Sequence, residues 1–265
     1  MNVEKMQTLY KIYFLFSSVL FSLFPGQVTA QNAVEHTLKL NKDGIKVYVH
    51  RHKNSGFRAF KAITCIDASL DSILAVMLDN DAYTEWGYAC NKSFVLKDLS
   101  FYERYHYQVL DIPFPFKDRD FVLHSLMQHN PSTQTVSITS SAVLDYCLSH
   151  PSAACNQVQQ TQHVRVSLSV GTFKLEPCKK GVQVTWSQHT DPAGKLPDWL
   201  VNQFVEDTPY WTLKNLSQKV KEEKYKYAKL IYDKQGYAIA FDAASQKAAV
   251  KASRKAKDFD LYPSF

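Results

Sequence analysis

The segment 182–220 constrains the fold of this chain more than any other. Apolar residues alternate with polar ones over 182–187, which is the period of a half-buried strand. Asp-Pro-Ala-Gly at 191–194 is typical of a turn, and Pro197 suits the first position of a helix. The helix predicted from there carries bulky apolar residues and two threonines along one side, namely Leu200, Phe204, Thr208, Trp211 and Thr212. This order predicts a sheet with a long helix packed over it.

The sequence before this segment indicates mainly strands. Residues 44–52 and 57–66 are predicted to form a hairpin, and Ser69 suits the N-cap of a helix that continues to Leu78. The other predicted elements are a short helix at 82–88, strands near 93–99, 101–111, 120–129, 135–143, 164–176 and 182–190, and a final helix from 197 to about 227. Strands that are segregated from helices favour the α+β class. We therefore expect a curved antiparallel sheet whose terminal helix leaves a cavity between helix and sheet.

The first 30 residues have the layout of a secretory signal peptide. Lys5 and Lys11 precede the apolar run 12–24, and Val28-Thr29-Ala30 ends in a small-residue cleavage site. The apolar run is shorter than the roughly 20 residues that a transmembrane helix needs. An exported protein, periplasmic or secreted, is therefore expected; the alternative is an uncleaved membrane anchor.

The chain contains five cysteines, and an oxidising compartment would allow some of them to pair. Cys147 and Cys155 bracket a short loop and are the predicted disulfide. The alternative is that all five are small buried residues. No Cys or His spacing typical of a metal site is present, so no metal is expected.

The net charge of +6 is unevenly distributed. Residues 214–257 hold twelve Lys and Arg against four Asp and Glu. Basic residues are not interleaved with aromatic ones along the strands, so nucleic-acid binding is not expected. The predicted organisation is a signal at 1–30, one domain at 31–235 and a basic tail at 236–265. The tail could contact anionic lipid headgroups or be a solvated terminus.

Four segments resemble the START (steroidogenic-acute-regulatory-related lipid transfer) domain family, most closely its bacterial members. They are Ile112–Val122 (IPFPFKDRDFV), Asp191–Asn202 (DPAGKLPDWLVN), Gly44–His52 and Asp79–Trp86. Their order along the chain matches the family, and the resemblance covers roughly Val34 to Lys219.

This resemblance implies a helix-grip fold around a hydrophobic tunnel. It also implies binding and transfer of a lipid such as a sterol, phospholipid or ceramide. We further expect a monomer without a cofactor that contacts membranes transiently. An acidic residue and an arginine face each other in the tunnel of some members, and their places fall at His106 and Ser125 here. Recognition by a buried ion pair is therefore not implied, although His and Ser could hydrogen-bond a hydroxyl or a headgroup. The candidate cavity residues are Trp86, His106, Phe121, Leu123, Ser125, Val184, Trp186, Leu200, Phe204, Thr208, Trp211 and Thr212.

Two other functions stay open from the sequence. Motifs of common hydrolases, metalloproteases and nucleotide-binding enzymes are missing, so a non-catalytic role is expected. A helix-grip enzyme of the cyclase or aromatase kind would have to use His106 with Tyr105 or Tyr107. A third possibility is a non-catalytic envelope protein that contacts a partner through its basic tail. For Arg119, holding the adjacent turn is favoured over contacting a headgroup.

Overall fold

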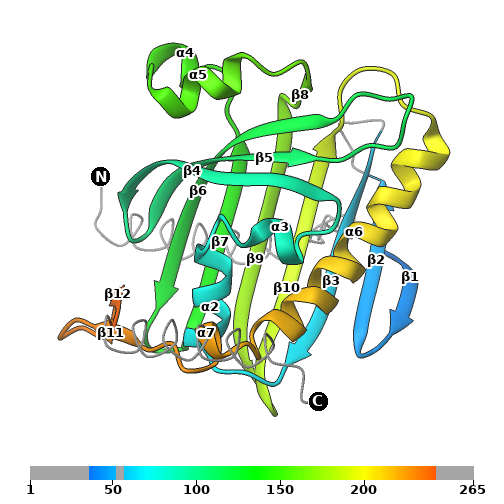
Figure 1. Ribbon diagram of the computed structural model, residues 1–265. Coiled ribbons are helices and arrows are strands. Elements are labelled where there is room, and N and C mark those ends of the chain that lie inside the picture. Colours follow the sequence, from blue (N-terminus) through cyan, green and yellow to red (C-terminus); the bar gives the residue numbers. More distant parts are fainter. Residues whose placement is uncertain (1–35, 52–56, 243–265) are drawn as a thin grey trace, which may run out of the picture. The chain divides into compact units, whose positions relative to one another are not determined.

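The computed structural model describes residues 36–51 and 57–242 (Figure 1). The predicted signal peptide at 1–30 lies outside the described residues, as does the predicted tail from 243 onward. No helix in these two described ranges is long and apolar enough to cross a membrane.

One ten-stranded sheet forms the framework, with the strand order β1-β2-β3-β10-β9-β7-β6-β5-β4. Neighbours along this path pair antiparallel, and β8 adds a short parallel pairing with β6. Its strands are β1 (Thr37–Lys42), β2 (Ile45–Arg51), β3 (Arg58–Ile66), β4 (Cys90–Ser100), β5 (Glu103–Leu110), β6 (Arg119–Asn130), β7 (Thr135–Ala142), β8 (Val164–Arg165), β9 (Leu168–Cys178) and β10 (Gly181–Asp191). The α+β class and the large antiparallel sheet with a C-terminal helix are confirmed.

The long helix α6 (Asp198–Lys219) crosses the face of the sheet at β2 and β3 (Figure 1). It also contacts α2 (Leu70–Leu78) and α3 (Tyr83–Trp86). Helix α2 begins where Ser69 accepts a hydrogen bond from the backbone N–H of Ser72 at 3.1 Å, as its sequence predicts. The remaining elements are α4 (Tyr146–Ser149), α5 (Ala153–Gln159), α7 (Glu223–Lys226), β11 (Leu230–Tyr232) and β12 (Ala238–Phe241).

The structure differs from the predicted elements at several places in the described residues. Strand β1 and the helices α4 and α5 were not predicted, and the strand expected at 164–176 is divided into β8 and β9. Helix α6 ends at Lys219 instead of near 227, because the chain turns there and buries both Val220 and Tyr225. Strand β12 lies within the predicted tail and pairs with β11. The periodicity of apolar residues cannot reveal where a helix or strand ends when the residues before and after that end are both buried.

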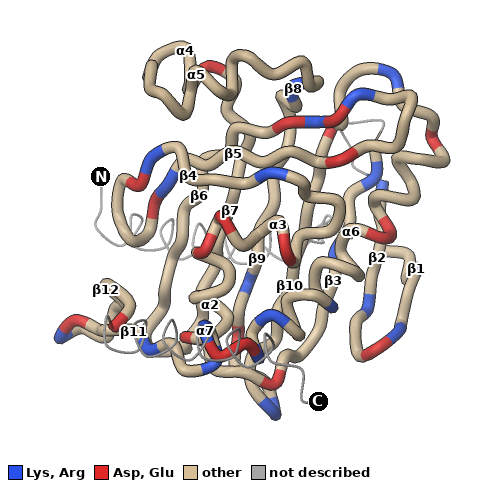
Figure 2. The backbone as a smooth tube through the Cα atoms, viewed as in Figure 1, with Lys and Arg blue, Asp and Glu red and all other residues tan. Residues whose placement is uncertain are grey.

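The corner between α6 and α7 is held by ion pairs. Lys219 lies 2.8 Å from Glu222 and also pairs with Glu85 of α3. Lys224 of α7 pairs with Asp79, the C-cap of α2. Figure 2 shows acidic and basic residues side by side around α7. The described part of the basic C-terminal segment is therefore partly neutralised by carboxylates of the domain itself.

The sheet is packed on both faces. On the α6 face, Val47, Val184 and Leu213 are completely buried. On the opposite face, Tyr107 and Val122 pack under the α4–α5 segment. Burying a side chain of this size stabilises the fold by about 1.5–3 kcal/mol, so both faces contribute to stability.

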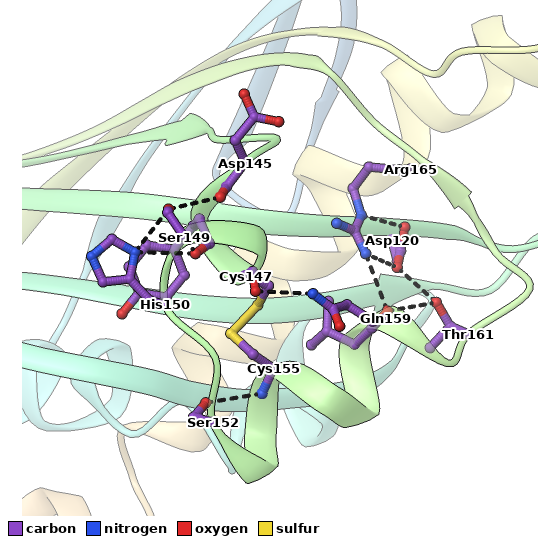
Figure 3. The surroundings of a disulfide bond; sticks show 12 residues. Asp120, Asp145, Cys147, Ser149, His150, Ser152, Cys155, Gln159, Thr161 and Arg165 are labelled. Atoms are coloured by element: carbon purple, nitrogen blue, oxygen red, sulfur yellow. Dashed lines mark hydrogen bonds and ion pairs between the residues drawn. A yellow bond between two sulfur atoms is a disulfide. The ribbon is translucent and has the colours of Figure 1, made fainter.

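Two disulfides connect the chain. Cys147 of α4 is joined to Cys155 of α5, as the sequence pattern predicts (Figure 3). Cys65 and Cys178 form a second disulfide, between the ends of β3 and β9, that was not predicted. Cys90 is the free thiol. The second pair is 113 residues apart, and only the register of the intervening strand β10 brings its members together.

The α4–α5 segment leads into β8, and a buried carboxylate fixes that strand (Figure 3). Asp120 is 1% exposed and accepts hydrogen bonds from Arg165 Nε at 2.9 Å and Nη2 at 2.8 Å. The hydroxyls of Tyr107 and Thr161 donate to the same carboxylate. Burial disfavours the ionised form, but the hydrogen bonds from Arg165, Tyr107 and Thr161 outweigh it and hold the pKa of Asp120 below its usual range.

Candidate functional site

A cavity of about 230 Å³ lies between the inner face of the sheet and the helices α2, α3 and α6. Its lining is predominantly apolar and aromatic. The sheet contributes mainly residues of β5, β6, β7, β9 and β10, and β3 adds Arg58 and Phe60. Helix α6 contributes Val201, Phe204, Val205 and Thr208. The cavity therefore has a sheet on one side and helices on the other, as the sequence predicts.

Eight of the twelve predicted cavity residues contribute to this lining: Trp86, His106, Phe121, Leu123, Ser125, Trp186, Phe204 and Thr208. The alternation of β6 brings Phe121, Leu123 and Ser125 to the same face. Trp186 packs between Phe60 and Phe173, with ring centroids 4.8 and 4.7 Å away. Aromatic rings therefore form much of the wall.

Four predicted residues do not line the cavity, contrary to the prediction. Val184 is completely buried in the core beside α6, and Leu200 is 2% exposed and does not belong to the cavity lining. Trp211 is 39% exposed. Thr212 is buried and its hydroxyl oxygen accepts the backbone N–H of Tyr88 at 3.0 Å. The face of α6 toward the cavity is rotated from the predicted one, because residues 212, 213 and 216 enter the core instead.

His106 is at the centre of a polar group in the lining. Its Nδ1 lies 2.6 Å from Asn80 Nδ2, and its Nε2 lies 3.4 Å from Ser125 Oγ. Ser125 Oγ in turn lies 2.5 Å from Ser140 Oγ. Burial, assisted by the nearby charge of Arg104, lowers the pKa of His106 to about 3. His106 is therefore neutral at physiological pH.

A second polar group lies on β9 and β10. Gln188 Nε2 donates to Ser169 Oγ at 2.8 Å and to Thr190 Oγ1 at 3.0 Å, and these two hydroxyls are 2.9 Å apart. Trp186 Nε1 donates to Gln188 Oε1 at 3.3 Å. A Cβ at Gly171 would lie 1.9 Å from that oxygen, so glycine is required for Gln188 to lie across the sheet.

Arg119 holds two loops together at one end of the cavity. Its guanidinium donates to the carbonyl oxygens of Pro192 at 3.0 Å, Ala193 at 2.9 Å and Lys117 at 2.5 Å. The loop after β5 and the turn between β10 and α6 are therefore fastened to each other. Of the two roles considered for Arg119, the contacts show the one that holds the turn.

The comparison with known families decides the assignment. The START domain model matches residues 36–225. The chain belongs to the START domain family. An uncharacterized protein of Pseudomonas aeruginosa is 33% identical over 190 residues, which are 71% of this chain and 88% of that protein.

Solved structures show the same fold. The STAR-related lipid transfer protein of Xanthomonas axonopodis is 31% identical, with a TM-score of 0.61 over 70% of this chain and 98% of that one. Human StAR-related lipid transfer protein 5 is 14% identical, with a TM-score of 0.60 over 82% of this chain and 98% of that one. The helix-grip arrangement is thus shared with START proteins of low sequence identity.

The residues proposed for a catalytic alternative are not brought together in this START domain. Tyr105 and Tyr107 alternate with His106 along β5 and belong to the opposite face. Tyr105 stacks on Tyr146 at 3.9 Å, and the hydroxyl of Tyr107 donates to Asp120. The His106 imidazole contacts Asn80 and Ser125 and no carboxylate among the described residues.

Sequence reasoning missed several polar groups of the START cavity, including Asn80, Arg104, Ser140 and Gln188. Asn80 lies in the segment between α2 and α3, which has no helical or strand periodicity from which the direction of a side chain could be predicted. Ser140 and Gln188 have the strand parity of the predicted residues Ser125 and Trp186, so alternation combined with the strand pairing would have found them.

Proposed function

We propose that this protein binds a lipid in the cavity between its sheet and α6. The observation that carries the proposal is the predominantly apolar lining of the cavity, which includes Phe60, Phe173, Trp186 and Phe204. Burial of hydrocarbon there would drive binding at about 25 cal/mol per Å² of apolar surface. A few polar groups would orient the ligand, which is the usual composition of a lipid or small-molecule site.

The ligand is proposed to be of the sterol or phospholipid class. The relative from Xanthomonas axonopodis is described as a lipid transfer protein, which supports this assignment. The cavity volume of about 230 Å³ lies just below the roughly 300–1,000 Å³ of typical ligand pockets. A large ligand would therefore require an outward movement of α6. Pro209 lies within this helix and cannot donate to the carbonyl of Val205, so the helix has a weak point beside the cavity.

Transfer would begin at a membrane surface, through the loops that Arg119 fastens together. Phe114 is 96% exposed in one of these loops, and Trp199 is 63% exposed at the start of α6. Leu196, three residues before Trp199, belongs to the cavity lining. Exposed aromatic residues beside a cavity opening suit insertion among lipid headgroups. We propose a monomer that docks there transiently and acts on its ligand without catalysis.

We also propose that the protein acts outside the cytoplasm, in the periplasm or as a secreted protein. The sequence of the first 30 residues and the two disulfides support this location, because disulfides persist in oxidising compartments.

Binding of a fluorescent sterol and of a fluorescent phospholipid tests the function. Phe204→Asp should weaken binding at least about tenfold, because it buries a charge in the cavity. Trp211→Asp on the exposed side of the same helix is the matched control and should bind as the wild type does. Combined Phe114→Ser and Trp199→Ser should leave binding intact and slow transfer between vesicles. Equal affinity of the Phe204 and Trp211 variants would contradict the proposed site.

A further inference from the structure

Two hydrogen-bond chains run through the polar side chains of the cavity, and each begins at a group that can only donate. In the first chain, Arg104 Nη1 lies 2.8 Å from Asn80 Oδ1. A guanidinium has no acceptor, so the amide atom that faces it must be the oxygen. The amide nitrogen of Asn80 then faces His106 Nδ1, which must accept. The proton of the neutral imidazole is therefore on Nε2.

This first chain ends in a pair of hydroxyls. His106 Nε2 donates toward Ser125 Oγ, and Ser125 Oγ shares a hydrogen bond with Ser140 Oγ. The two hydroxyls carry two hydrogens, and only one of them lies between the oxygens. Because His106 donates, it cannot accept the other hydrogen, and no acceptor for it is found in the part of the chain that the structure describes. One hydroxyl hydrogen of this pair remains for a ligand.

The second chain has the same construction. Trp186 Nε1 can only donate, so the amide atom of Gln188 that it faces is the oxygen. The amide nitrogen of Gln188 donates to both Ser169 and Thr190. These two hydroxyls share one hydrogen, and the other again has no acceptor within residues 36–51 and 57–242. Both chains thus deliver a donor to the cavity.

The register of the sheet sets the spacing of the two donors. Ser140 of β7 is paired with Gly171 of β9, so Ser169 is its diagonal neighbour. Diagonal neighbours on one face of an antiparallel pair are about 7–8 Å apart. The indole Nε1 of Trp86, another lining residue, is buried and also lacks a hydrogen-bond partner among the described residues. Unused donors therefore recur among the described residues of the cavity lining.

We propose that the cavity selects a lipid with carbonyl oxygens, of the ester or ketone class, which accept hydrogen bonds from the Ser125–Ser140 and Ser169–Thr190 pairs. This inference rests on the proposed lipid-binding function and specifies its ligand. A carbonyl oxygen only accepts hydrogen bonds. Unlike a hydroxyl group, it has no hydrogen that would itself need an acceptor in the cavity.

A matched pair of probes tests this selectivity: a long-chain methyl ketone and the n-alkane of the same chain length. Each competes with a fluorescent lipid for the wild-type protein. The ketone should bind about three- to tenfold more tightly, which corresponds to one net hydrogen bond. Ser140→Ala should reduce this preference, since it removes one hydroxyl of the donor pair. Thr139→Ala is the control, because Thr139 pairs with Thr172 on the opposite face of β7 and β9 and should keep the full preference.

Equal affinity of ketone and alkane for the wild type, or an unchanged preference in Ser140→Ala, would overturn the inference. Failure of both probes and of fluorescent lipids to bind would overturn the proposed function itself. NMR of isotope-labelled histidine gives a readout that does not depend on any variant. It should show His106 as the neutral tautomer protonated on Nε2, and a proton on Nδ1 would contradict the direction of the first chain.

Discussion

At the scale of the residue, one polar group of this cavity is centred on a histidine that is buried in its neutral form. His106 is 7% exposed and its pKa is lowered to about 3, primarily by burial. A protonated, positively charged histidine at this position would attract an anionic headgroup. Here Asn80 and Ser125 take the places next to it, so the ring acts as one member of a fixed hydrogen-bond chain.

The depressed pKa of His106 makes stability depend on pH. The unfolded chain binds a proton to this histidine below about pH 6.5, whereas the folded chain does so only near pH 3. Stability from this group is therefore complete above pH 6.5 and is lost as the pH falls from there toward 3. The free energy of unfolding should drop by about 2 kcal/mol between pH 7 and pH 5 because of His106 alone. Urea unfolding at several pH values measures it.

The variant His106→Gln should remove this part of the pH dependence, since glutamine can hydrogen-bond but does not titrate. His150→Gln, at an exposed position that ends α4, is the matched control and should keep the wild-type profile. If the slopes of the wild type and of His106→Gln agree between pH 7 and pH 5, His106 is not buried in its neutral form.

Strand alternation was sufficient to predict some residues of the cavity and insufficient for others. Phe121, Leu123 and Ser125 follow Arg119 at every second position of β6. Assigning one of them to the cavity face therefore assigns all three to it. On α6, helical periodicity selected Leu200, Trp211 and Thr212, which do not belong to the cavity lining. A helix that contacts both a core and a cavity has two apolar sides, and the sequence does not say which side meets which.

At the scale of the element, the two disulfides close loops of very different length. The Cys65–Cys178 bond spans 113 residues and the Cys147–Cys155 bond spans 8. If each bond acts by restricting the unfolded chain, the longer loop should contribute about 2 kcal/mol more stability. The strand pairs β3–β10 and β10–β9 should therefore gain most from the bond that the sequence did not predict.

Two double variants measure this difference. Cys147→Ala with Cys155→Ala retains only the long-range disulfide, and Cys65→Ala with Cys178→Ala retains only the short one. Urea unfolding of each protein in its oxidised and reduced forms isolates the contribution of the remaining bond. Equal contributions would show that the stabilisation does not come from loop closure.

The order of the elements was predictable because it depends on local patterns. The hairpin of β2 and β3, helix α2 after Ser69, and the turn before α6 all follow from periodicity and capping residues. The α4–α5 segment was missed because its helices are only four and seven residues long. Helices this short gain their stability from a disulfide and from packing under the sheet, and neither is visible in a short window of sequence.

At the scale of the whole described domain, the two faces of the sheet have separate roles. One face packs under the α4–α5 segment, where Asp120 and Arg165 fix β8 (Figure 3). The other face carries the core beside α6 and, further along the same strands, the cavity. The packing of the outer face does not involve α6, so a movement of α6 would leave it intact, as the proposed uptake of a lipid would require.

The central claim is that this cavity holds a lipid. The most direct measurement is organic extraction of the purified native protein followed by mass spectrometry. Our account predicts about one lipid molecule for each chain of wild-type protein, with ester or ketone oxygens, and much less from Phe204→Asp than from Trp211→Asp. Recovery of no lipid, together with failure to bind fluorescent sterols and phospholipids, would contradict it.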